Sequence, residues 1–188
     1  MPAHLYIKNM VCNRCIMVVK NIIEEAGLEP VSVELGEVEL KVPPTDAQLE
    51  RISKELENVG FEILTDQKKK IIERIKSSIV QHIQSDELDN AHNFSDLLSS
   101  ALNKEYSYLS KLFSEAEGIT IEKYIIDQKI EKVKELLAYG ELTLSEISYK
   151  MGYSSVAHLS SQFKKVTGFN PTDFRKQKNH HRKPLDEV

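Results

Sequence analysis

The chain has no tryptophan, only two cysteines and no long apolar run among its 188 residues. No apolar stretch approaches the roughly 20 residues that a membrane-spanning helix needs. The N-terminal residues, MPAHLYIK, also lack the basic, apolar and small-residue zones of a signal peptide. We therefore expect a cytoplasmic protein with no membrane contact. In that compartment two cysteines are more often thiols or metal ligands than a structural disulfide.

The sequence also shows no pattern of catalytic residues. No nucleophile, base and orienting group occur together in a recognisable pattern, so we expect that the protein is not an enzyme. A dithiol redox centre is the one enzymatic reading that a Cys-x-x-Cys sequence allows. The absence of tryptophan and of thioredoxin-like surroundings disfavours it.

Positive charge is scarce in the first third of the chain. Residues 1–66 carry six Lys and Arg against twelve Asp and Glu, a net charge of −6. Residues 144–183 carry eight Lys and Arg against two acids, a net charge of +6. A basic segment of this kind suits the phosphate backbone of DNA, although a solvated basic tail would give the same pattern.

The N-terminal 66 residues alternate between strand and helix patterns. Apolar residues recur at every second position in 5–7, 31–35 and 38–42, and at helical spacing in 15–26 and 49–59, and Phe61 and Ile63 begin a last strand. The order strand, helix, strand, strand, helix, strand predicts the split βαβ, ferredoxin-like plan. We expect one face of the central hairpin to be acidic and wet.

Cys12 and Cys15 fall at the junction of the first strand and the first helix. Two intervening residues allow both sulfurs to reach one ion, and the helix N-terminus and Arg14 favour the thiolate form. With Met10 ahead of them, these residues resemble the heavy-metal-associated domain, whose signature is Met, one variable residue and Cys-x-x-Cys. Asn9 replaces the glycine that usually precedes the methionine. We expect Met10 to pack in the loop rather than to bind metal.

The resemblance implies that Cys12 and Cys15 bind a soft ion such as Cu(I), with Ag(I) or Zn(II) as further candidates. Thiolates favour soft metals, and Zn(II) would require more ligands than the two that the local sequence offers. A homodimer that pools two cysteine pairs would supply four. The cysteines could also be inert in a domain that serves dimerisation or partner binding, and this alternative remains open.

Residues 143–176 carry the pattern of two helices around a tight turn. Thr143 and Glu146 form a capping box at the start of the first helix, and Gly152 supplies a turn residue tolerant of positive φ. The second helix has an apolar stripe, which we expect at Val156, Leu159, Phe163 and Val166. Its other face is small, polar and basic, as a helix that enters a DNA groove requires.

A similar unit lies earlier in the chain, at residues 97–113. It is called the first unit below, and residues 143–176 are the second unit. Leu97, Leu98 and Leu102 predict a helix, residues 103–105 a turn, and Leu109, Leu112 and Phe113 the core face of the next helix. A long helix follows, with Ile126, Ile130, Val133 and Leu137 at helical spacing, and Gly140 ends it. The chain therefore contains two predicted helix-turn-helix units joined by one long helix.

This doubled arrangement resembles the DNA-binding domain of AraC/XylS-type regulators. The residues that carry the resemblance are 108–113 (YLSKLF), 146–153 (EISYKMGY), 163–171 (FKKVTGFNP) and 174–176 (FRK). The resemblance implies one recognition helix in each unit. The residues expected to face DNA are Tyr106, Ser107, Ser110 and Lys111 in the first unit, and Val156, Ala157, His158, Ser161, Gln162, Lys164 and Lys165 in the second.

The chain departs from the family pattern at several positions. Lys129, Val133 and Ser148 stand where the family usually has Arg, Ala and Ala, and we expect helix packing to survive these changes. Residues 88–126 contain three Lys and six acids, a net charge of −3. We therefore expect the first unit to bind DNA weakly and the second to supply most of the affinity.

Together these patterns predict an α+β protein in three parts. Residues 1–66 are the ferredoxin-like domain, 67–178 the double helix-turn-helix domain and 179–188 a disordered tail that includes His180 and His181. The leading hypothesis is a transcriptional regulator that binds double-stranded promoter DNA in response to a soft metal ion. The alternatives are an AraC-type DNA-binding protein whose N-terminal domain handles no metal, and a metal carrier.

Overall fold

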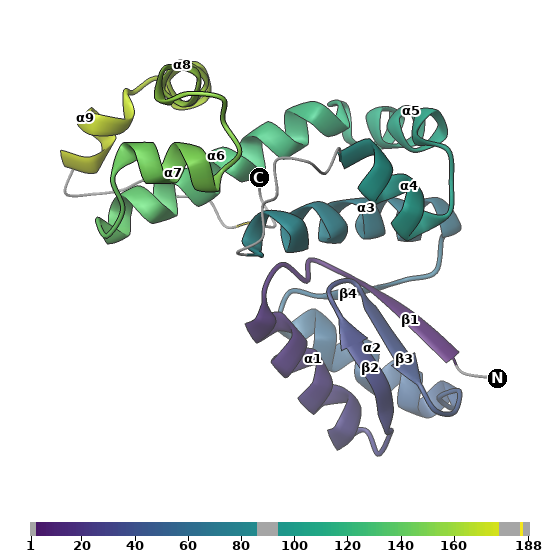
Figure 1. Cartoon of the computed structure of the whole chain (residues 1–188). Coiled ribbons are helices and arrows are strands. Elements are labelled where there is room, and N and C mark those ends of the chain that lie inside the picture. Colours follow the sequence, from purple (N-terminus) through teal and green to yellow (C-terminus); the bar gives the residue numbers. More distant parts are fainter. Residues whose placement is uncertain (1–2, 86–93, 177–184, 186–188) are drawn as a thin grey trace. The chain divides into compact units, whose positions relative to one another are not determined.

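The computed structural model describes residues 3–85, 94–176 and 185 (Figure 1). By their packing, the residues fall into two compact units, Met1–Gln81 with Leu98–Leu112, and His82–Leu97 with Phe113–Val188. The predicted tail, with His180 and His181, lies outside the described residues except for Leu185. The predicted domain boundary between residues 66 and 67 stays a prediction. None of the described helices is long and apolar enough to span a bilayer.

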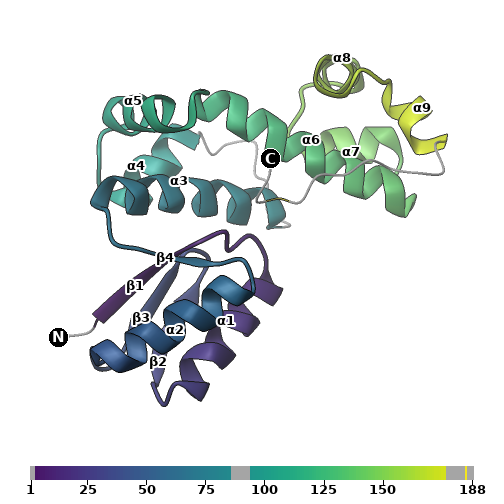
Figure 2. The ribbon, with the colours of Figure 1, turned by 180° about the vertical axis from the view of Figure 1, so that it is seen from behind.

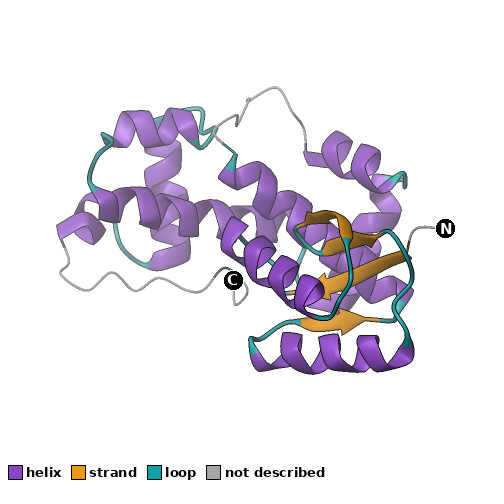
Figure 3. Cartoon of the chain, turned by 90° about the horizontal axis from the view of Figure 1, so that it is seen from below, coloured by secondary structure: helices purple, strands orange, loops and turns teal. Residues whose placement is uncertain are grey.

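Four short strands form one antiparallel sheet in the order β2-β3-β1-β4 (Figure 2). The strands are β1 (Ala3–Lys8), β2 (Pro30–Glu34), β3 (Glu37–Leu40) and β4 (Glu62–Leu64), with α1 (Asn13–Glu25) after β1 and α2 (Asp46–Asn58) after β3. This is the element order that the sequence predicts. In the rest of the described chain every regular element is a helix (Figure 3).

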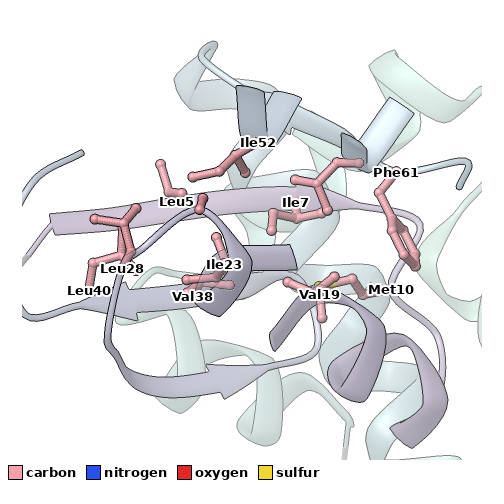
Figure 4. Packing of buried hydrophobic residues seen from close by; sticks show 12 residues of the cluster. Leu5, Ile7, Met10, Val19, Ile23, Leu28, Val38, Leu40, Ile52 and Phe61 are labelled. Atoms are coloured by element: carbon pink, nitrogen blue, oxygen red, sulfur yellow. The ribbon is translucent and has the colours of Figure 1, made fainter. Parts of the chain in front are cut away.

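A single apolar core joins this sheet to both of its helices (Figure 4). Alternate residues of β1 and β3 point into it, including Ile7 and Val38, and α1 and α2 contribute Ile23 and Ile52, all of them fully buried. Met10, just beyond β1, is also buried in this core. Because its side chain packs inside, the structure agrees with a packing role for Met10 rather than with metal binding.

Three valines that belong to the apolar patterns in 31–35, 38–42 and 49–59 are exposed. Val31 is 60% exposed because the pairing of β2 with β3 shifts register between Pro30 and Ser32, which breaks the alternation of faces. Val42 follows the end of β3, and Val59 is the residue that caps α2, so neither belongs to the regular element that its spacing suggested.

Helix α3 (Gln67–Gln84) carries isoleucines at positions 71, 72, 75, 79 and 83 and begins four residues ahead of the first of them. The polar residues 67–70 form its first turn, because the Asp66 carboxylate accepts the backbone N–H groups of Lys68 and Lys69 at 2.8 and 3.0 Å. These hydrogen bonds lower the pKa of Asp66. The connection between the sheet and the helical part is therefore a helix.

Six further helices make up the remainder of the described chain. They are α4 (Phe94–Leu102), α5 (Tyr106–Glu117), α6 (Ile121–Tyr139), α7 (Leu144–Lys150), α8 (Val156–Thr167) and α9 (Pro171–Lys176). The core positions predicted at Leu109, Phe113, Leu159 and Phe163 are fully buried. The predicted long helix is α6, in which Ile130, Val133 and Leu137 are buried and Ile126 is half-buried beside the buried Ile125.

Candidate functional site

The turn between α7 and α8 has the local structure that its residues predict. Thr143 and Glu146 form a complete capping box at the start of α7, and Gly152 adopts a φ of 71° beyond its end. Ile147 and Met151 are fully buried beneath this turn. The hydrogen bonds from Thr143 also lower the pKa of Glu146. The turn thus fixes the direction in which α8 leaves (Figure 1).

Side-chain contacts hold the first turn of α8 in place. The Ser155 hydroxyl caps the helix by accepting the backbone N–H of His158 at 3.1 Å. The His158 ring lies 3.1 Å from the Ser154 hydroxyl through Nδ1, and edge-on to the Tyr153 ring at 5.3 Å between centroids. His158 is exposed but is fixed by its neighbours, so its ring presents a defined donor or acceptor.

The residues predicted to contact DNA lie on the outer side of α8. Ala157, His158, Ser161, Lys164 and Lys165 are exposed, and Val156 and Gln162 are half-buried. Positions 157, 161 and 164 follow i, i+4, i+7 spacing, so they share one face. Val166, expected in the apolar stripe, is instead 36% exposed. The buried residues of α8 are Leu159 and Phe163.

A half-buried cation supports the same turn from beneath. Lys129 of α6 donates to the Met151 carbonyl at 3.0 Å and lies 5.7 Å from the centres of the Tyr153 and Phe94 rings. Partial burial lowers the pKa of Lys129, and burial raises that of Tyr153 to about 12. Ser148 and Val133 are buried, so the substitutions at these three positions fit the packing.

The first predicted unit has a similar local form. α4 ends at Leu102, Asn103 takes a φ of 50° in the turn, and α5 starts at Tyr106. Along α5, Ser107 and Lys111 are exposed, whereas Tyr106 and Ser110 are half-buried. The predicted residues therefore reach the surface of this helix too.

The two cysteines come together at the N-terminus of α1. Their sulfur atoms are 3.5 Å apart, both side chains are partly buried, and both are free thiols. Cys12 is the capping residue, and its carbonyl accepts the backbone N–H of Cys15 at 2.9 Å. The helix N-terminus is an environment that favours a thiolate.

The two thiols have different acidities. Burial raises the pKa of Cys12, but hydrogen bonds from Cys15 and the backbone and charge of Arg14 outweigh it, and the net shift is downward. Burial is also the largest influence on Cys15, and together with the thiol of Cys12 it raises the pKa of Cys15. Cys12 is therefore the stronger acid of the pair.

In the loop ahead of the cysteines, an asparagine rather than a glycine adopts the left-handed backbone conformation. Asn9 has a φ of 71°, a conformation that asparagine tolerates better than most residues. Its side chain donates to the Gly60 carbonyl at 3.0 Å, and its backbone N–H donates to Glu73 at 3.0 Å. The sequence drew attention to Asn9, but nothing in the pattern indicated Glu73 as its partner.

The donor set suits a soft ion with few ligands. Among residues 3–85, 94–176 and 185, no three His, Cys, Asp or Glu side chains gather to hold a metal. Metal–sulfur bonds of about 2.3 Å would place two sulfurs about 3.8 Å apart in a tetrahedral site and about 4.6 Å apart in a linear one. The observed 3.5 Å is close to the first value, so linear binding requires the thiols to rotate apart.

Comparison with known proteins identifies the type of domain in the helical region. Residues 98–177 match the helix-turn-helix domain family model. Over 80 residues the chain is 32% identical to the Msm operon regulatory protein of Streptococcus mutans and 36% identical to the xylose operon regulatory protein of Escherichia coli. The matched segments cover 43% of this chain, but only 29% and 20% of those two proteins.

A solved structure shares the general fold. ToxT from Vibrio cholerae superposes with a TM-score of 0.50 at 18% identity, covering 87% of this chain and 67% of that one. The family match and the likeness to the two operon regulators, rather than this superposition, support a helix-turn-helix domain of the AraC type at residues 98–177. The chain spans less than a third of the length of either operon regulator, so those proteins define the domain and not the activity of the whole molecule.

Proposed function

We propose that this protein is a transcriptional regulator that binds promoter DNA through its two helix-turn-helix units and responds to a soft metal ion held by Cys12 and Cys15. The observation that supports DNA binding is the outer face of α8, where exposed small, polar and basic side chains follow a rigidly capped first turn. Both of the similar operon regulators are regulatory proteins by name, which agrees with this role.

On that face, different residues suit different parts of DNA. His158 and Ser161 can donate to base edges, and Val156 and Ala157 can contact thymine methyl groups. Lys164 and Lys165, one turn further along α8, suit the phosphate backbone. We infer that α8 enters the major groove, and that α5, in an acidic segment, contributes less affinity.

Support for metal binding comes from the N-terminal module. Its βαββαβ order and β2-β3-β1-β4 sheet are those of the ferredoxin-like fold, to which we assign it. The cysteine pair at the α1 N-terminus matches the signature of the heavy-metal-associated domain, and the difference in acidity leaves Cys12 ready to lose its proton first. Cu(I) is the ion that we favour.

A metal-binding measurement tests this part of the proposal. Anaerobic titration of the purified protein against a Cu(I) chelator should give one ion per cysteine pair, or one per two pairs if copies combine. Cys12→Ser and Cys15→Ser variants should each lose this binding. Wild-type affinity in both variants would exclude the site, and the protein would then be a DNA-binding protein with an N-terminal module for partner contacts.

DNA binding needs a separate test. Selection of binding sites from random duplex DNA by the purified protein should recover a defined sequence. A chain that recovers no preferred sequence would contradict the regulator hypothesis and favour a metal carrier whose helices contact other proteins.

A further inference from the structure

Helix α3 is buried over a wider arc than one stripe. Glu73, Ser77 and Val80 follow i, i+4, i+7 spacing on one face, Ile72, Ile75 and Ile79 lie on the adjoining face, and all six are buried. A helix on a protein surface normally buries a single stripe. α3 is therefore held on both of these faces, as an element that transmits movement between its neighbours must be.

One side of α3 contacts the loop that leads to the cysteines. The Glu73 side chain, 7% exposed, accepts the backbone N–H of Asn9 at 3.0 Å. Asn9 lies only three residues before Cys12 and is already constrained by its positive φ and its bond to Gly60. A charge-assisted hydrogen bond at a buried position is among the stronger polar contacts in a protein. Movement of this loop therefore acts directly on α3.

The same side of α3 is seated against the sheet. A Cβ atom on Gly36, in the turn between β2 and β3, would lie 3.1 Å from the Ser77 hydroxyl, so this glycine permits the close approach. Arg74 lies 3.6 Å from the Glu37 carboxylate, and Lys70 lies 4.9 Å from the centre of the Tyr6 ring. These contacts fix the rotation of α3 about its axis.

Arg74 also reaches the first helix-turn-helix unit. Its guanidinium donates to the Ala101 carbonyl, in the last turn of α4, at 3.2 Å. Carbonyl groups at a helix C-terminus attract cations. Ala101 lies two residues before Asn103, in the turn that leads into α5, and residues Leu98–Leu112 belong to the same compact unit as the cysteine loop. The N-terminal part of α5, the predicted recognition helix, therefore belongs to the same compact unit as Cys12 and Cys15.

We propose that α3 couples the two functions: Glu73 links the cysteine loop to α3, and Arg74 links α3 to the first helix-turn-helix unit. Metal binding at Cys12 and Cys15 would change DNA affinity through the placement of α5. This inference rests on the proposed metal response and specifies its route. For coupling, the metal and the DNA must each bind one placement of α3 more tightly than another. If both favour the same placement, each raises the affinity for the other, and if they favour different placements, each lowers it by the same factor.

The test compares operator affinity with and without metal in matched variants. A duplex selected from random DNA is titrated at zero and at saturating buffered Cu(I), with wild type, Glu73→Gln, Arg74→Gln and Arg74→Lys. Arg51→Gln is the control, because Arg51 is an exposed arginine on α2. Wild type and the control should show a shift of roughly 5- to 150-fold, the usual range for allosteric coupling. Thermal melting checks that each variant folds.

Arg74→Gln should bind Cu(I) like wild type in the absence of DNA but lose most of the shift, whereas Arg74→Lys should retain part of it because a lysine can still reach one of the two partners. Unchanged shifts in both Arg74→Gln and Glu73→Gln would overturn the route through α3 and leave metal sensing intact. Metal binding to wild type with no shift in operator affinity would overturn both proposals.

A second readout needs no metal. In the metal-free protein, operator DNA should change the alkylation rate of the two thiols in wild type, and the change should disappear in Arg74→Gln. Alkylation rates that DNA leaves unaltered in wild type would contradict the coupling even if the metal response were real.

Discussion

Replacing Lys164 and Lys165 by glutamine tests the DNA-facing role of α8 through its dependence on salt. Both lysines are exposed in the last turns of this helix. Each phosphate contact contributes about 0.9 to the slope of log affinity against log salt. Losing both should therefore reduce the magnitude of the slope by about 1.8. Over a fourfold range of salt, each lost contact changes the affinity ratio about 3.5-fold.

Fluorescence anisotropy with a labelled operator duplex measures this slope. Lys54→Gln is the matched control, because Lys54 is exposed on α2 in the acidic N-terminal module and should leave the slope unchanged. The loss should be similar for operator and unrelated DNA, since phosphate contacts carry no sequence information. A double variant with the slope of wild type would refute the placement of this face on the phosphate backbone.

Three further changes test the local structure. Phe163→Ala, which empties a fully buried position against Phe174, should cost about 3–5 kcal/mol in the free energy of unfolding of the helical region, and a loss in denaturant melts below about 1 kcal/mol would contradict the packing. Asn9→Gly and Asn9→Ala both lose the bond to Gly60, but only alanine strains the left-handed backbone, so Asn9→Ala should have a free energy of unfolding about 1–2 kcal/mol below that of Asn9→Gly in denaturant melts. Equal free energies of unfolding for the two variants would be inconsistent with the φ of 71°. Because the pKa of Cys12 is lowered and that of Cys15 raised, mass spectrometry should find Cys12 alkylated at lower pH than Cys15, and the reverse order would disprove the assigned acidities.

Much of the fold follows from local signals in the sequence. The capping box of Thr143 and Glu146 and the turn at Gly152 set the bounds of α7 because each acts on backbone groups within a few residues. The strand and helix order of the N-terminal module follows from changes in apolar period. Leu159 and Phe163 were correctly predicted as buried, because their spacing matches one face of a helix.

The remaining features depend on contacts between distant residues. Val31 is exposed because of a register shift in strand pairing, and hydrophobic alternation carries no information about such a shift. Glu73 is a buried polar residue whose partner is the backbone N–H of Asn9, and buried Ser77 lies close to the turn at Gly36, so both side chains meet residues far away in the sequence. A polar residue at such a position resembles a surface residue, so the pattern indicated only the isoleucine side of α3. The sulfur separation at Cys12 and Cys15 likewise depends on side-chain rotation, which spacing does not determine.

The proposed metal response is tested by operator affinity as a function of buffered Cu(I), measured in parallel for wild type and for the Cys12→Ser/Cys15→Ser variant. We expect wild-type affinity to shift at the Cu(I) concentration that fills the thiol site, and we expect the variant to bind DNA equally well with or without the ion. A wild-type protein that binds its operator with one affinity at every Cu(I) concentration would contradict the proposed metal response.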